Sequence, residues 1–225
     1  SVEVLAQRGI EGGGEDLDAR VVEWLLAEFR EQTGVEGGAD PVVRARMRDA
    51  SEKARVALSG QKDVTIHLPY LAADEAGPKH LQVKLTQARL EKLVVDLLDR
   101  CAATVQRALD DSGRAADKVT QVLLVGGCSR MPAVHERVET IFKRIPSDAW
   151  NADDVVARGA AIFAGLLASR SPELVVHEAL SRPLWLQVGA GEVRPLFARG
   201  AAVPAEHSEP LTTPGDGRAG PECRV

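Results

Sequence analysis

One segment restricts the possible folds of this 225-residue chain more than any other. Residues 119–125 are almost uniformly apolar, and two glycines, Gly126 and Gly127, separate them from a helix pattern that opens at Pro132. A short apolar run bounded by polar residues and glycine is typical of a strand buried on both faces, as in a parallel sheet. The sequence therefore predicts an α/β fold with this strand inside the sheet.

A last helix is predicted beyond this strand, over about residues 152–167, where apolar residues recur at helical spacing. This segment is rich in small residues, among them Gly159 and Gly165. Small side chains allow another backbone or a ligand to come close. We therefore expect this helix to lie against a sheet or a ligand.

The first half of the chain begins with two amphipathic helices. Apolar residues recur at a spacing of four from Leu17 to Phe29, and Gly34 follows them as glycine often follows a helix C-terminus. Pro41 marks the start of the second helix, because proline is favoured in a first helical turn. The second helix is predicted to bury a face that runs from Val43 to Leu58.

The pattern then changes to a period of two. Apolar and polar residues alternate over 64–68 and again over 81–85, and the turn-forming stretch 74–78 lies between them. This arrangement predicts an antiparallel hairpin. Thr86 is a suitable N-cap for the longest predicted helix, about residues 87–111.

Composition excludes several classes of protein. A net charge of −5 and an aromatic content of 4% argue against nucleic-acid binding through a basic surface or a base-stacking platform. No apolar run approaches the roughly 18–20 residues of a membrane helix, and no signal-peptide pattern is visible. The three cysteines and five histidines lack metal-ligand spacing, so neither zinc nor a disulfide framework is expected. The sequence predicts a cytoplasmic protein.

The glycine turn is the first candidate site. Glycines let a ligand approach the backbone, and the free amides of a helix start favour an anion or a ribose–phosphate edge. Packing alone also produces such turns in many α/β proteins. Residues 128–131 break the Gly-x-Gly-x-x-Gly pattern, which disfavours a dinucleotide-dependent enzyme without closing that alternative. Cys128, with His135 nearby in sequence, suggests a nucleophile, but the sequence identifies no acid–base partner.

Several motifs together resemble the seventy-kilodalton heat-shock chaperone family of the DnaK type. The main ones are residues 13–18, residues 48–59, the glycine turn and residues 151–161. They occur in the order and spacing of lobe II of that family's actin-like ATPase domain. The resemblance covers about residues 2–167, and residues 173–212 more loosely resemble the linker and opening strands of the substrate-binding domain.

The resemblance implies an α/β fold class: a partial actin-like (ribonuclease-H-like) ATPase lobe with an inserted α+β subdomain and a short β-rich C-terminal segment. The lobe would span residues 1–168, with a helix–hairpin–helix subdomain inserted at residues 13–103. Residues 169–212 would form the linker and a partial β substrate-binding segment. Residues 213–225, rich in proline and glycine without periodicity, are expected to be disordered.

The resemblance also implies an adenosine site between one helix and the glycine turn. Glu52, Arg55 and Ser59 share one helical face. The acid and hydroxyl would bind the ribose, and the arginine stem would lie along the purine. On the other side, Arg130 would stack on the adenine and Met131 would wall the pocket. The full implied set is Gly14, Glu15, Glu52, Arg55, Ser59, Gly126, Gly127, Cys128, Arg130, Met131 and Asp153.

Purely structural roles remain an alternative for these residues. Charges at the spacing of Glu52 and Arg55 usually mark a solvated helix face, and Glu15 and Asp153 are equally suited to helix capping. No catalytic residue and no metal ligand is assigned within the chain.

The implied function is the ATP-binding part of an ATP-dependent chaperone that assists protein folding in the stress response. ATP or ADP would be the cofactor, with unfolded client proteins and co-chaperones as partners. The phosphate loops and magnesium ligands of the family would precede Val2, so we expect a fragment that supplies the adenosine half-site without hydrolysis of its own. The alternative is a truncated, non-catalytic module that binds a partner protein.

Overall fold

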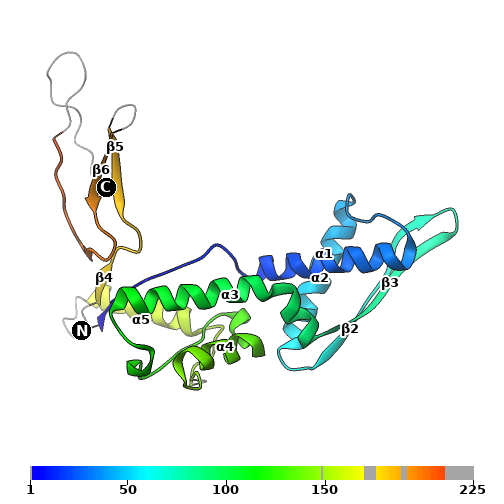
Figure 1. Cartoon of the computed structure of the whole chain (residues 1–225), viewed down its shortest axis with the longest axis horizontal. Coiled ribbons are helices and arrows are strands. Elements are labelled where there is room, and N and C mark those ends of the chain that lie inside the picture. The colour runs from blue at the N-terminus through cyan, green and yellow to red at the C-terminus, as the bar shows by residue number, and fades with distance from the viewer. Residues whose placement is uncertain (1, 148, 170–175, 189–191, 211–225) are drawn as a thin grey trace, which may run out of the picture. The chain divides into compact units, whose positions relative to one another are not determined.

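The structure is a computed structural model that describes residues 2–147, 149–169, 176–188 and 192–210. Figure 1 shows its helices and strands in chain order. Contacts divide the chain into two units, one of residues 8–170 and one that joins residues 1–7 to residues 171–225. Every residue of the implied adenosine site belongs to the larger unit.

Three helices and a hairpin build the core of the larger unit (Figure 1). Helices α1 (Gly14–Thr33) and α2 (Pro41–Leu58) pack on each other, and the hairpin of β2 (Asp63–Asp74) and β3 (Gly77–Thr86) packs against both. Helix α3 (Gln87–Ser112) contacts α1 and β3. The fully buried side chains include Val21, Leu25, Phe29, Val43, Met47, Leu58, Leu81, Leu85 and Val94.

Local signals define the ends of these helices. The Asp40 carboxylate accepts a hydrogen bond from the Val42 N–H at 2.7 Å and so caps α2. Thr86 caps α3 by accepting from the Arg89 N–H at 3.1 Å. Gly34 ends α1 with a φ of +73°, a left-handed conformation that costs glycine little. The three helices predicted from the first half of the sequence are confirmed.

The predicted hairpin is confirmed, with β2 and β3 antiparallel. Val64 lies opposite Leu85 and Leu68 lies opposite Leu81, so the apolar residues of both strands share the face that packs on the helices. The register shifts between Leu68 and Ala72.

The strand predicted at residues 119–125 is wrong. Within the described residues this segment forms only an isolated parallel bridge, between Leu123 and Ser147. The side chains of Leu123 and Val125 are each 48% exposed. An apolar run is buried on both faces only when neighbouring strands and covering layers surround it, and the described residues supply one bridging residue instead.

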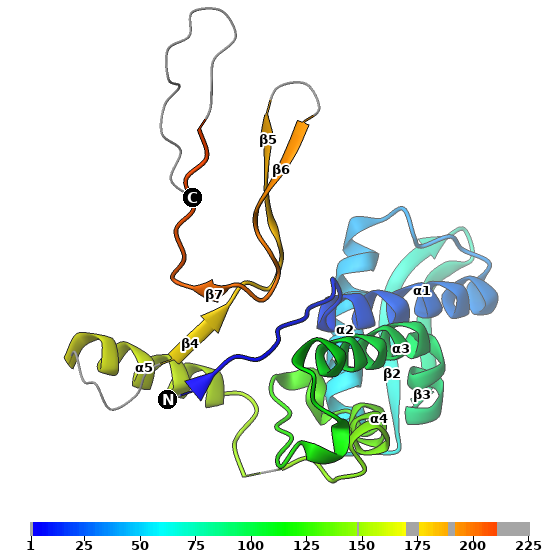
Figure 2. The ribbon, with the colours of Figure 1, turned by 60° about the vertical axis from the view of Figure 1, so that its left-hand side comes forward.

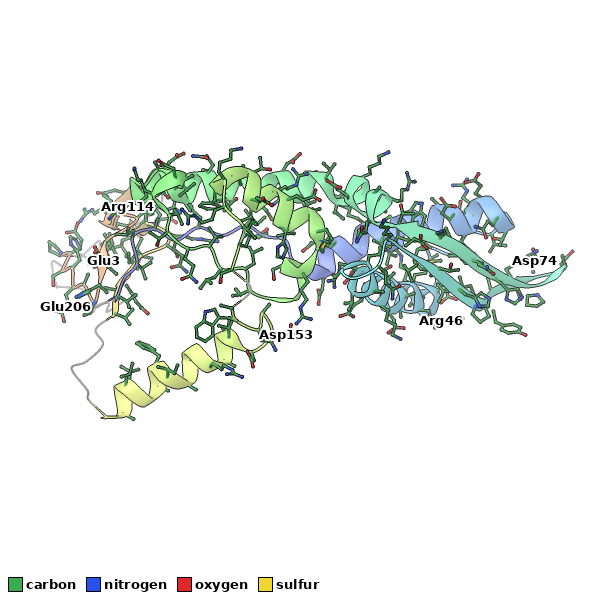
Figure 3. All side chains as sticks on the ribbon, turned by 90° about the horizontal axis from the view of Figure 1, so that it is seen from below. Glu3, Arg46, Asp74, Arg114, Asp153 and Glu206 are labelled. Atoms are coloured by element: carbon green, nitrogen blue, oxygen red, sulfur yellow. The ribbon has the colours of Figure 1, made fainter. Side chains whose placement is uncertain are left out.

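A helix does form near residues 152–167, as α5 (Val155–Ser169), but the expected close approach is wrong. A Cβ atom built on Gly159 or Gly165 would meet no other atom within 4 Å. Ile162 is 64% exposed, and Figure 3 shows α5 as the helix that follows the labelled Asp153. The small residues of α5 therefore face open space.

The smaller unit contains short strands (Figure 2). Strand β1 (Val2–Glu3) pairs parallel with β4 (Val176–Ala179), which pairs antiparallel with β7 (Ala202–Val203). Strands β5 (Leu184–Val188) and β6 (Glu192–Phe197) form an antiparallel pair.

Strand β1 is joined by hydrogen bonds to β4, far from it in the sequence. The Val4 N–H extends this pairing by donating to the His177 carbonyl at 2.9 Å. The expected disordered tail, residues 213–225, lies outside the described residues.

Replacing Phe29 with alanine should destabilise the larger unit by about 3–5 kcal/mol, because a fully buried ring leaves a cavity at the centre of the core. Urea unfolding, followed by the fluorescence of the buried Trp24, measures the change. Val42→Ala is the control: Val42 is exposed on α2, and its loss should cost less than about 0.5 kcal/mol. Equal effects of the two substitutions would contradict this core.

Candidate functional site

The glycine turn leads into a short helical segment, η2 (Gly127–Arg130), and then into α4 (Pro132–Phe142). Gly126 has a φ of +83°, which a residue with a side chain rarely adopts. The Ser129 hydroxyl donates to the Gly126 carbonyl at 2.6 Å, and the Ser129 N–H donates to the same oxygen at 3.0 Å. The turn is therefore closed by its own hydrogen bonds.

A buried ion pair lies behind this turn. The Arg55 guanidinium donates to both Asp18 carboxylate oxygens, from Nε at 2.7 Å and from Nη2 at 3.0 Å. The side chains of Arg55 and Asp18 are only 9% and 6% exposed. Burying both charges is costly, and the two parallel hydrogen bonds offset that cost.

The pair keeps the guanidinium charged. Hydrogen bonding to Asp18 raises the pKa of Arg55 above its ordinary value, against the opposing effect of burial. Arg55 is thus a fixed positive charge on the turn side of the core.

Three residues of the implied adenosine site, Gly14, Arg55 and Cys128, lie close together around the Arg55 guanidinium. Arg55 Nη1 lies 3.6 Å from the Cys128 sulfur. A Cβ atom on Gly14 would lie 3.2 Å from Arg55 Nη2 and 3.3 Å from the Cys128 sulfur, so a larger residue would crowd both groups. The fold brings together the start of α1, the last turn of α2 and η2.

A second arginine pair lies at the exposed end of η2. Arg130 forms an ion pair with Asp153, and their side chains are 50% and 56% exposed. The Asn151 side-chain oxygen accepts from the Asp153 N–H at 3.0 Å, and the Asp153 carboxylate pairs with Arg130. A guanidinium that pairs with a carboxylate through the N–H groups at its edge keeps both of its planar faces open for stacking.

The remaining implied residues lie around these two groups. Glu15 and Glu52 are exposed, and the Ser59 hydroxyl makes a long hydrogen bond of 3.4 Å to the Arg55 carbonyl. Asp16, rather than Glu15, caps α1, because its carboxylate accepts from the Gly13 N–H at 2.7 Å.

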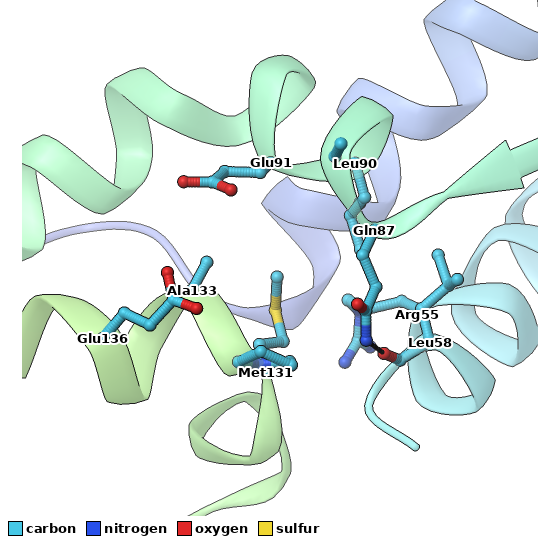
Figure 4. A pocket seen from close by; sticks show the side chains of 10 residues that line it. Arg55, Leu58, Gln87, Leu90, Glu91, Met131, Ala133 and Glu136 are labelled. Atoms are coloured by element: carbon cyan, nitrogen blue, oxygen red, sulfur yellow. Dashed lines mark hydrogen bonds between the residues drawn. The ribbon is translucent and has the colours of Figure 1, made fainter. Parts of the chain in front are cut away.

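Met131, at the start of α4, is 3% exposed. Together with Arg55 it lines a cavity of about 220 Å³ between α2, α3 and α4 (Figure 4). Met131 therefore lines a pocket between these helices that is open to solvent on one side.

Asp18, the buried partner of Arg55, is the residue of this candidate site that sequence reasoning missed. Its position carried a signal, because it precedes the buried residues Val21 and Val22 by three and four positions and so lies on the apolar stripe of α1. A carboxylate on such a stripe needs a buried partner. Arg55, four residues after the buried Ser51 on α2, fulfils that need.

Within the described residues, no group of three or more histidine, cysteine, aspartate or glutamate side chains is arranged to hold a metal ion. None of the described helices is both long enough and apolar enough to cross a membrane.

The helices, the hairpin and the glycine turn define a mixed α/β chain of the kind that forms part of an ATPase domain. The family model described as Hsp70 protein matches residues 2–225, and the chain belongs to this family. Its members are chaperones that generally bind ATP or ADP with Mg²⁺ and act on client proteins. The match confirms the resemblance drawn from the sequence motifs.

Replacing Asp18 with alanine should destabilise the larger unit by about 3–5 kcal/mol, because Arg55 is left as a buried charge without a partner. Urea unfolding measures this loss. Asp96→Ala is the control, since its pair with Arg20 is half exposed and should contribute at most about 1 kcal/mol. The double substitution Asp18→Leu, Arg55→Met should recover part of the loss; a double variant as unstable as the sum of its parts would exclude the pair as the cause.

Proposed function

We propose that the larger unit binds the adenosine part of ATP or ADP within an ATP-dependent chaperone. The supporting observation is the meeting of Gly14, Arg55 and Cys128, which the family resemblance assigns to one nucleotide site. These residues come from three separate elements, and the buried pair of Arg55 with Asp18 holds them in place.

The burial of Arg55 supports different roles for Arg55 and Arg130 in adenosine binding. The Arg55 side chain is only 9% exposed, so its guanidinium contributes charge but has no accessible planar face for a base. We therefore assign the stacking role to Arg130, whose side chain is 50% exposed. The adenine would stack on the planar face of the Arg130 guanidinium, which forms an ion pair with Asp153. The exposed Glu52 and the half-buried Ser59 would bind ribose hydroxyls.

The residues of the chain fit the nucleoside better than they fit a magnesium ion. Asp153 and Asp154 are the adjacent acids that could suggest a metal pair. Arg130 neutralises Asp153, and Arg158 neutralises Asp154 through a pair at 2.9 Å. We therefore derive no step through a metal in this chain, and the proposed role is binding and orientation of adenosine.

A second candidate function is a module that binds a partner protein. It is favoured by the apolar residues that α5 exposes to solvent, since large apolar patches often mark protein-binding surfaces. Val156, Ile162 and Leu167 are 67%, 64% and 66% exposed.

Calorimetric titration with ATP, ADP and NAD, with and without magnesium, separates the alternatives. Binding of ATP or ADP supports the adenosine site. Binding of NAD alone would support the dinucleotide-dependent enzyme, and binding of no nucleotide would leave the partner-binding module.

Arg130→Ala should weaken ADP binding about tenfold, because a partly desolvated guanidinium stack contributes about 1–2 kcal/mol. Cys128→Ala should have a smaller effect, since the sulfur contacts Arg55 rather than the assigned base position. Calorimetric affinities of the two variants test this order. Equal losses would indicate general damage to the turn and would argue against stacking.

The chain is expected to bind ATP without hydrolysing it. All proposed contacts touch adenosine, which does not change during phosphoryl transfer, and interactions of equal strength in substrate and transition state do not raise the rate of the chemical step. A phosphate-release assay on the 225-residue chain measures this. Magnesium-dependent turnover that disappears in Asp153→Asn would overturn the assignment of Asp153 to the adenine end.

A further inference from the structure

The cavity between α2, α3 and α4 has an apolar wall and one acidic side (Figure 4). Its volume is about 220 Å³. An engineered apolar cavity of about 150 Å³ binds benzene, so this cavity has room for one aromatic ring with a small substituent. The apolar wall consists of Leu58, Leu90, Met131, Pro132 and Ala133.

Two carboxylates form the acidic side. Glu91 extends from α3 and Glu136 from α4, and Figure 4 shows both on the same side of the cavity. Among the described residues, neither carboxylate has a hydrogen-bond or ion-pair partner. Glu91 is half-buried and Glu136 is exposed. A partly desolvated carboxylate without a partner, such as that of Glu91, attracts a cation more strongly than one in bulk water.

Two polar groups on the other side already have partners. The charge of Arg55 is neutralised by Asp18, and the Gln87 side-chain amide donates to the Leu58 carbonyl at 2.8 Å. Arg137, next to Glu136 in sequence, pairs with Asp99 at 2.9 Å through Nη1, while its buried Nε has no hydrogen-bond partner among the described residues. None of these groups forms an ion pair with Glu91 or Glu136 among the described residues.

We propose that this cavity is a second binding site, for a small aromatic cation. The ring would lie against Leu90 and Met131, and an amidinium or ammonium group would bind between Glu91 and Glu136. The two carboxylates would favour a positively charged ligand, and the apolar wall would favour a planar ring. This site is separate from the stacking position assigned to Arg130.

Benzamidine is a suitable probe, because it joins one ring to a planar cation that can donate to two carboxylates. Binding is measured by NMR titration of the full chain. We expect saturable binding to the intact chain and at least a tenfold loss in the double variant Glu91→Gln, Glu136→Gln. Glutamine keeps the size of each side chain, and circular dichroism verifies that the variant folds.

Three controls make the test specific. Glu139→Gln removes an exposed carboxylate of α4 that does not line the cavity, and it should leave benzamidine binding unchanged. Benzyl alcohol, a neutral ring of similar size, should bind more weakly and should not respond to the glutamine substitutions. Arg130→Ala should weaken ADP binding but not benzamidine binding, so failure of the adenosine site and failure of this proposal are distinguishable.

Absence of benzamidine binding at millimolar concentration would overturn the proposal. Equal binding of benzamidine and benzyl alcohol, or unchanged benzamidine binding in the double glutamine variant, would overturn it as well, because the carboxylates would then not select the ligand.

Discussion

The buried pair of Asp18 and Arg55 is the interaction on which the site depends. It joins α1 to α2 through two hydrogen bonds at positions where each helix turns its apolar face inward. A buried charge tolerates little displacement from its partner, so the pair sets how the two helices meet. Gly14 lies against the same guanidinium, and the start of α1 accordingly has no room for a side chain there.

The Asp18–Arg55 and Arg130–Asp153 pairs, which lie on either side of the glycine turn, have different physical roles. The Asp18–Arg55 pair is almost fully buried, and it supports the turn from behind. The Arg130–Asp153 pair is half exposed, contributes little stability in water and leaves a planar cation at the surface. The proposed adenosine site uses this contrast, because the buried pair would hold the frame of the site and the exposed Arg130 would be accessible to the base.

Charge compensation also distinguishes the cavity from its surroundings. Asp18, Asp153 and Asp154 are each paired with an arginine, whereas Glu91 and Glu136 line the cavity without a partner among the described residues. Helix α5 has a similar unmatched surface, in this case apolar. Its large apolar residues are exposed, whereas a helix usually buries one apolar face.

The sequence by itself determined the elements whose signals are local: the helices from Gly14 to Ser112, the helix start at Pro41, the cap at Thr86, the β2–β3 hairpin, and the motifs that identify the family. Only the tertiary structure decided that Arg55 is buried against Asp18, because their contact joins two helices and no local pattern encodes it. It also decided that residues 119–125 are exposed. A periodic pattern records that a segment is apolar, but burial depends on which other elements cover it.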